Sequence, residues 1–106
     1  MEMVLHVEDG QAFRKIKDTM LADETVNRAS ITFKDAKMYT QKAGNLIIVS
    51  GTDDRLKAAA AIAKAEKTAD GKPVAAELEG KEKEEVLRKL KEEEDRAIEG
   101  MGGIFG

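Results

Sequence analysis

Cysteine and tryptophan are absent from the chain, and proline and histidine occur once each. Without cysteine the protein has no disulfide, no thiolate zinc site, no iron–sulfur ligation and no Cys nucleophile. A metal or catalytic site therefore depends on oxygen ligands and one imidazole.

Aromatic residues and net charge are also low. Aromatic side chains make up 4% of a composition that is 42% hydrophobic, so we expect an aliphatic core. The 18 basic and 21 acidic residues leave a net charge of −3, which creates no field that would attract a phosphate backbone. We therefore expect no nucleic-acid partner.

Long hydrophobic runs are missing, because no apolar stretch approaches the length of a membrane span. The first residues, MEMVLHVEDG, lack the basic start and apolar run of a signal peptide. With 106 residues, enough for one core and too few for two, we expect a single cytoplasmic domain without membrane association. Abundant Glu and Lys with little Pro suit a protein from a hot environment, where ion-pair networks contribute more.

Hydrophobic periodicity predicts the first elements of the chain. Residues 3–7 alternate with a period of two, which predicts a strand that ends at Asp9 and Gly10. Residues 11–22 follow a helical period, and Asp9 is placed to accept hydrogen bonds from the first helical amides. Residues 27–34 alternate again, and a change of phase after Lys34 predicts a β-bulge near Lys34 and Asp35.

Turn and capping residues divide the next part of the chain. A hairpin turn at residues 43–45 leads into LIIVS, an unbroken apolar run that is typical of a strand covered on both faces. Thr52 is a good N-cap for a helix with Asp53 and Asp54 in its first turn, and this helix ends at residues 69–71. After Pro73, residues 74–78 alternate as a short peripheral strand.

The predicted order of strand, helix, strand, strand, helix, strand indicates an α+β domain over residues 1–80. It resembles the ferredoxin-like βαββαβ sandwich, in which two helices cover one face of a four-stranded antiparallel sheet. The first and third strands are expected in the middle of that sheet. Residues 81–99 predict an additional C-terminal charged amphipathic helix, and residues 100–106 form a Gly-rich hydrophobic tail.

Several ferredoxin-like families carry motifs that this chain lacks. RNA-recognition domains have aromatic residues on their central strands, copper chaperones have a CxxC pair, and acylphosphatases have a Gly-rich loop with an Arg after strand one. Here that loop reads EDGQAF, and Arg14 already lies inside the first helix. The amino-acid-sensing, ACT-like type remains, and the chain resembles it in topology. This resemblance implies a regulatory module whose ligands bind at subunit interfaces.

Two groups of residues are candidates for chemistry. His6 is the candidate catalytic residue, with Glu77 on the neighbouring fourth strand as its orienting acid. Asp53 and Asp54 are candidate metal ligands because hard cations bind several oxygens. Adjacent helical residues point about 100° apart, which favours helix capping by this pair. The alternative function is a small metal-dependent hydrolase or another enzyme that uses His6 and nearby carboxylates, whereas the preferred interpretation needs no cofactor.

The face of the sheet away from the two helices is predicted to be apolar. Val4 lies on it, together with either residues 46 and 48 or residues 47 and 49, since both pairs are apolar. Soluble proteins rarely leave such a patch exposed to water. The helix at 81–99 of the same chain, a second copy, or both in one dimer can cover it.

The last residues, EGMGGIFG, place apolar side chains among glycines. Gly100 suits the position that follows a helix, after which the tail either packs on its own protomer or inserts into a groove of a partner. The preferred interpretation is a non-catalytic interaction or regulatory module that self-associates or docks a protein partner. Its predicted partner-binding residues are all apolar: Val4, Val86, Leu87, Leu90, Ile98, Met101, Ile104 and Phe105.

Overall fold

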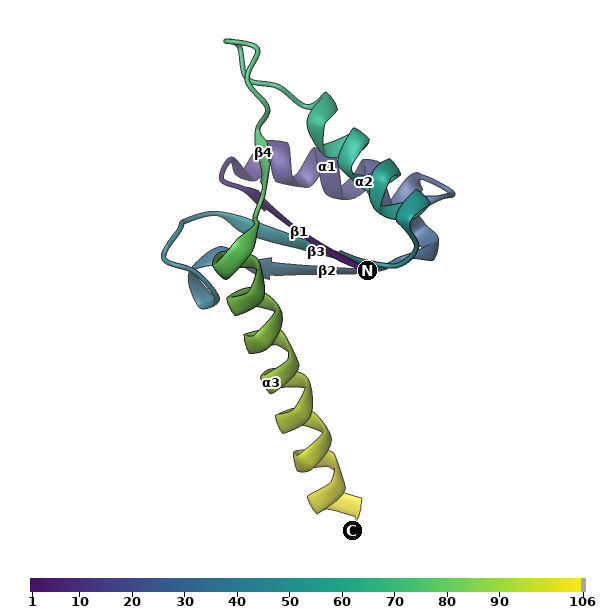
Figure 1. The fold of residues 1–106 in the computed structure, drawn as a ribbon, viewed down its shortest axis with the longest axis vertical. Coiled ribbons are helices and arrows are strands. Elements are labelled where there is room, and N and C mark those ends of the chain that lie inside the picture. The colour runs from purple at the N-terminus through teal and green to yellow at the C-terminus, as the bar shows by residue number, and fades with distance from the viewer. Residues whose placement is uncertain (106) are drawn as a thin grey trace.

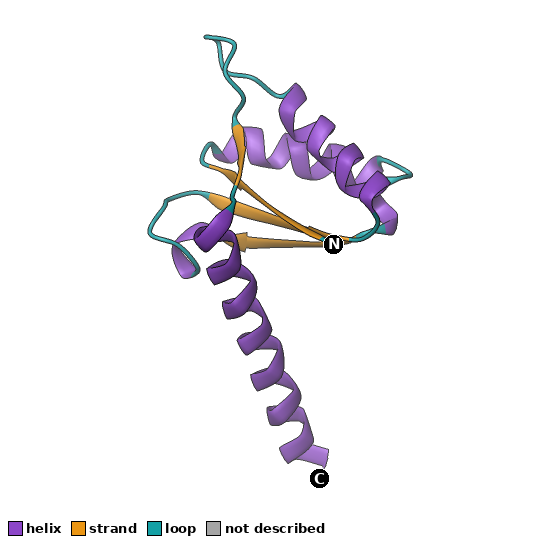
Figure 2. Cartoon of the chain, in the orientation of Figure 1, coloured by secondary structure: helices purple, strands orange, loops and turns teal. Residues whose placement is uncertain are grey.

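The computed structural model describes the backbone of residues 1–105 and the side chains of residues 1–96. Over these residues the fold is α+β, with a four-stranded antiparallel sheet and three α-helices (Figures 1 and 2). The elements in chain order are β1 (Glu2–Val7), α1 (Gly10–Ala22), η1 (Val26–Arg28), β2 (Ser30–Asp35), η2 (Ala36–Met38), β3 (Asn45–Ser50), α2 (Asp53–Ala65), β4 (Ala75–Glu77) and α3 (Gly80–Phe105), where η marks a 3₁₀ helix.

The strands lie in the order β2-β3-β1-β4, so β1 and β3 occupy the centre of the sheet. Each neighbouring pair is antiparallel, with Val4 opposite Ile48 and Thr32 opposite the same Ile48. The predicted α+β class and four-stranded antiparallel sheet are confirmed, and the strand order is compatible with a ferredoxin-like arrangement.

Helices α1 and α2 cover one face of the sheet, which we call the front (Figure 1). Because successive strand residues point to opposite faces, the odd-numbered residues of β1 meet these helices. They form the main core with Ile16, Met20 and the small residues Ala59 and Ala63 of the helices. The Asp9 side chain accepts a hydrogen bond from the Gln11 amide at 3.2 Å, which confirms its predicted capping role.

The predicted bulge near Lys34 and Asp35 is wrong. β2 pairs with β3 without interruption from Ser30 to Asp35, and the chain then turns into η2. Asp35 starts this turn because its carboxylate accepts a hydrogen bond from the Lys37 amide at 3.1 Å. The change of hydrophobic phase after Lys34 therefore marks the end of the strand.

The opposite face, which we call the back, is covered by α3 of the same chain. Its centre consists of Val4, Leu46 and Ile48, which are 0%, 0% and 5% exposed. These side chains form a second core, and the register decides between the two apolar pairs of β3. The residues packed against this centre come from η2, the loop after it, the end of β4 and the start of α3: Ala36, Tyr39, Leu78, Val86, Leu87 and Leu90.

Two of the predicted partner-binding residues are therefore buried inside the protomer. Val4 and Val86 are both 0% exposed because α3 packs against the back of its own sheet. This fold does not offer them to a partner. Leu87 and Leu90 are only half-buried at the edge of the same core.

Only the first part of α3 lies on the sheet, and the rest extends away from the back of the domain (Figure 1). At 26 residues and a rise of 1.5 Å per residue, the helix is about 39 Å long. Its backbone continues through the Gly-rich segment, so the expected helix end at Glu99 and Gly100 is not observed. The side chains of Ile98, Met101, Ile104 and Phe105 lie outside the described side chains.

Substitution Val86→Ala tests the contact of α3 with the back of the sheet. We expect it to lower the free energy of unfolding by about 1–3 kcal/mol, because two buried methyl groups leave a cavity beside Val4 and Ile48. Urea unfolding measures the change. Arg96→Ala, at an exposed position of the same helix, should change stability by less than about 0.5 kcal/mol. Equal effects of the two substitutions would contradict this packing.

Candidate functional site

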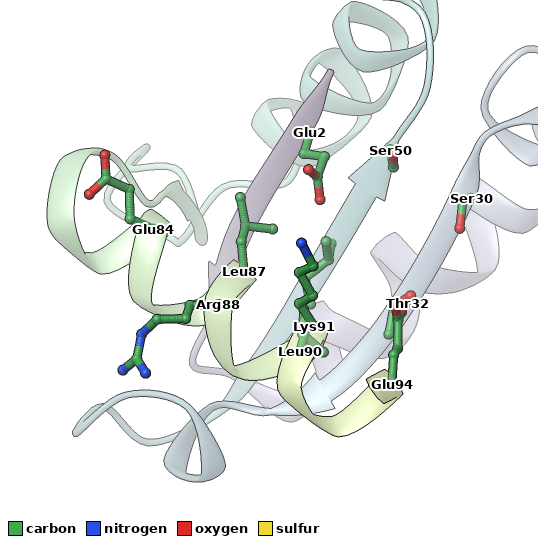
Figure 3. Close-up of a pocket in the computed structure, with 11 residues that line it drawn as sticks. Glu2, Ser30, Thr32, Ser50, Glu84, Leu87, Arg88, Leu90, Lys91 and Glu94 are labelled. Carbon is green, nitrogen blue, oxygen red and sulfur yellow. The ribbon is translucent and has the colours of Figure 1, made fainter. Parts of the chain in front are cut away.

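A groove of about 740 Å³ lies between α3 and one end of the sheet's back (Figure 3). We call it the back groove. Its lining comes from β1, β2, β3 and α3, and it combines hydroxyl, carboxylate, cationic and apolar groups: Glu2, Ser30, Thr32, Ile48, Ser50, Glu84, Leu87, Arg88, Leu90, Lys91 and Glu94.

The strand register explains why this end of the back is polar. Ser50 lies opposite both Ser30 and Glu2, so hydroxyls and a carboxylate form the last row across three strands. The next row holds Thr32 and Ile48, where the apolar centre begins. Because the last row is polar, it can remain in contact with water while the apolar rows beside it are packed under α3.

Helix α3 supplies the opposite wall of the back groove. Leu87 and Leu90 face the strands, whereas Arg88 points away from them (Figure 3). The Arg88 guanidinium donates to Glu85 at 2.7 Å and to Glu92 at 3.0 Å along the helix surface. The positive charge of Arg88 is therefore paired with two carboxylates of α3 itself. The groove suits an occupant with apolar side chains and a polar backbone, because it offers both kinds of surface.

A set of polar contacts holds α3 to the segment between β2 and β3. The Tyr39 hydroxyl donates to a Glu93 carboxylate oxygen at 2.6 Å, and the Lys89 ammonium donates to the Tyr39 carbonyl at 3.3 Å. Lys42 and Glu82 form an ion pair at 3.2 Å. Burial, together with the hydrogen bond to Glu93 and its negative charge, raises the pKa of Tyr39 to about 12. Tyr39 is thus a neutral donor at physiological pH, and it fixes the position of α3.

The structure gives His6 a role in holding a loop. The imidazole is half-buried on the back of the sheet, and its Nε2 lies 2.6 Å from the Ala43 carbonyl oxygen. A carbonyl only accepts, so Nε2 carries the proton and donates. Gly44 follows with φ +101°, and a Cβ there would lie 2.6 Å from the Glu8 Cα. The loop therefore packs closely on the end of β1.

The orienting acid expected for His6 is not placed to act on it. His6 lies opposite Ala76 on β4, whereas Glu77 lies opposite Leu5. Neighbouring positions of a strand point to opposite faces, so Glu77 points to the front and His6 to the back. The predicted pairing of His6 with Glu77 is wrong because the strand register differs by one residue from the one it requires.

The candidate carboxylates are also distributed over opposite ends of the sheet. Asp9 follows the end of β1, where His6 lies, but Asp53 and Asp54 follow the end of β3, which is beside the start of β1. Asp53 forms an ion pair with Lys57 at 3.1 Å within α2, and the Thr52 side chain makes no capping hydrogen bond. Among the described residues, no group of three or more metal-ligating side chains is close enough together to hold a metal ion.

The sequence does not predict the Tyr39–Glu93 contact or the hydroxyl residues that line the back groove. Nothing local in the sequence marks Tyr39, because its partner Glu93 is 54 residues away along the chain. The hydroxyl residues of the groove have a weak sequence signal: the alternation of Ser30 and Thr32 with Ile31 and Phe33 indicates that one face of β2 is polar.

Comparison with known proteins gives no relative: no protein-family model, no curated protein and no solved structure matches the chain. Within the described residues, no helix is both long and apolar enough to cross a membrane.

The single tyrosine makes the contact between Tyr39 and Glu93 directly measurable. We expect the tyrosinate absorbance to rise with a midpoint near pH 12 in the folded chain and near pH 10 in urea, because folding raises this pKa. The neutral phenol therefore contributes stability that is complete below pH 10 and is lost as the pH rises towards 12. Equal midpoints in the folded and urea-unfolded chains would contradict the contact.

Tyr39→Phe should remove this pH dependence and lower the free energy of unfolding at neutral pH by about 1.5–3 kcal/mol, as the loss of a hydrogen bond to a charged group does. Urea unfolding of both proteins at neutral pH and at pH 10–11 measures the difference. The gap between them should become smaller at the higher pH. A gap that stays constant would show that the hydroxyl stabilises the fold in some other way.

Proposed function

We propose that the protein is a non-catalytic interaction module that self-associates, and that the outer part of α3 is its main contact. The observation that carries this proposal is the course of α3. The described side-chain contacts with the rest of the protomer are made up to Glu93, while the helical backbone continues to Phe105. About three further turns therefore extend beyond the sheet.

The sequence of this outer segment supports binding to a partner. It contains Ala97, Ile98, Met101, Ile104 and Phe105, and their spacing of three and four residues is that of one helix face. A short helix alone in water is marginally stable, and packing of an apolar face supplies most of the stability of such helices in proteins. Each of the large apolar side chains gains about 1.5–3 kcal/mol from burial.

A second copy of the chain is the partner that fits this pattern most simply. Leu87 and Leu90, half-buried on the sheet, belong to the same series as the outer residues, at a repeat of three and four: Leu87, Leu90, Glu94, Ala97, Met101 and Ile104. Such a repeat favours the side-by-side pairing of two helices. Glu94 is the one charged position in the series, and a polar residue in such a seam selects one register at a cost in stability.

The α+β fold is compatible with an interaction module that self-associates. The strand order β2-β3-β1-β4 supports a ferredoxin-like core, and the ACT-like resemblance in topology leads us to infer a regulatory role. In that role the core would position α3, and ligands or partners would act on the association of two copies.

Replacing two outer apolar residues tests the proposal. In the full chain, Met101→Gln with Ile104→Gln keeps a good helix former at each position but removes apolar surface. We expect the full chain to sediment as a dimer at micromolar concentration, and the variant to have a Kd at least about 100-fold higher, since two side chains per copy lose their burial.

The matched control is Arg96→Gln with Glu99→Gln, which introduces the same residue twice in the same helix and leaves the net charge unchanged. It should sediment like the parent chain. A parent chain that is strictly monomeric at micromolar concentration, or a control that dissociates as readily as the test variant, would remove the basis for self-association through α3.

A further inference from the structure

Strand β2 is a long open edge of the sheet. Of the two edge strands, β4 is three residues long and follows Pro73, whereas β2 is six residues long and pairs only with β3. Native proteins shorten, interrupt or cover such edges because an unpaired strand readily accepts another strand. β4 is protected in this way, and β2 is a full-length template.

The hydrogen-bond pattern identifies which residues of β2 face the open edge. The Ala36 amide donates to the Gly44 carbonyl at 2.9 Å, directly beyond the last pair of the ladder. Bonded and non-bonded pairs alternate along an antiparallel ladder. Ser30, Thr32 and Lys34 therefore bond to β3, whereas the backbone N–H and C=O groups of Ile31 and Phe33 are directed outward. Within the described residues, no other hydrogen bond reaches these outward groups.

The side chains of this edge differ between the two faces. Ile31 and Phe33 are half-buried on the front, where they pack against the main core. The Phe33 ring meets the Phe13 ring edge to face at 5.8 Å between centroids, and Lys17 lies 5.1 Å from its centroid. Thr32 is on the back, where it lines the back groove. The main core therefore extends to the edge strand, where Ile31 and Phe33 remain partly exposed.

We propose that the β2 edge is an interface for a second copy of this chain, paired antiparallel with Thr32 opposite Thr32 of the other copy. This register places Ile31 opposite Phe33 of the second copy, and Phe33 opposite its Ile31. Pairs of an aromatic with a β-branched residue and of two threonines are among the favourable cross-strand pairs. The outward groups of Ile31 and Phe33 then bond to each other, and the two sheets become one of eight strands.

The side chains of β2 also disfavour the register that is shifted by one residue towards Asp35. The register shifted towards Ser30 pairs only residues 30–32 of each strand, because β2 begins at Ser30. A pairing centred on Phe33 is compatible with the same outward backbone groups, but it places the apolar Ile31 opposite Asp35 of the second copy. It also places Thr32 opposite Lys34. The edge is thus self-complementary about Thr32, and this is the reason for choosing a second copy over an unrelated peptide strand.

This pairing agrees with the course of α3 and rests on the self-association proposed above. A two-fold axis through Thr32, perpendicular to the sheet, keeps the backs of both sheets on one side. Both α3 helices then leave from that side. Each crosses towards β2, because Glu93 lies 3.9 Å from the Lys34 ammonium and Glu94 lines the back groove with Thr32. The outer parts of α3 are therefore brought near the axis and to each other.

A single cysteine at the axis tests the register, because the chain has no native cysteine. Thr32 and its counterpart form a non-bonded pair, whose Cα atoms are about 4.5 Å apart, within the range of a disulfide. We expect full-length Thr32→Cys to form a disulfide dimer under mild oxidation at least about tenfold faster than Thr68→Cys, at an exposed site of the loop before β4.

Two further variants test the same register as a matched pair. Ser30→Cys and Lys34→Cys should each oxidise slowly alone, but an equimolar mixture should form the mixed disulfide, because the register pairs residue 30 with residue 34 of the other copy. In the unmodified chain, the amides of Ile31 and Phe33 should exchange about tenfold or more slowly in the dimer than after dilution. Fast exchange of both amides in the dimer overturns the interface.

The outcomes separate this interface from the proposed α3 contact. If the reduced chain is a dimer but Thr32→Cys oxidises no faster than Thr68→Cys, the edge pairing is wrong and self-association stands. If Thr32→Cys forms its disulfide equally well when Met101→Gln and Ile104→Gln are added, the edge pairing stands and the α3 contact is wrong. A monomer without a disulfide overturns both.

Discussion

The packing of the start of α3 on the back of the sheet is the contact on which the rest of this structure depends. An antiparallel sheet can leave one face in water only if that face is polar, and here its centre is Val4, Leu46 and Ile48. Val86 and its neighbours on α3 remove these side chains from water. Without that cover the domain would expose an apolar surface whose burial is comparable in free energy to the net stability of a small protein.

The same contact determines what the protomer leaves open. The apolar centre of the back is short, so α3 is needed over only part of its length and the remaining turns extend from the domain (Figure 1). At the end of the sheet, the row of Ser30, Ser50 and Glu2 needs no apolar cover, and the back groove forms there. The same small domain also has a full-length edge strand, and the proposed association with a second copy depends on this strand and on the extended helix.

Polar contacts between distant parts of the chain fix the positions of α3 and of the segment between β2 and β3. Tyr39 and Lys89 link the segment after η2 to α3, and His6 holds the next part of that segment on β1. The one histidine, which by residue type is the natural candidate for catalysis, donates to the Ala43 carbonyl. Asp9, which follows the same strand, caps α1. The polar side chains that the sequence offers as catalytic candidates thus form structural hydrogen bonds.

The sequence alone determined the elements and their order, because period and capping are local: alternation marked β1, and Asp9 marked the start of α1. It could not decide which residues of β3 face the back, since LIIVS is apolar at every position and either register buries an apolar pair. Only the pairing of β1 with β3 made that choice. The contact of Tyr39 with Glu93 and the separation of His6 from Glu77 were likewise decided by the tertiary structure. The first depends on the packing of α3, and the second on the register of β1 with β4.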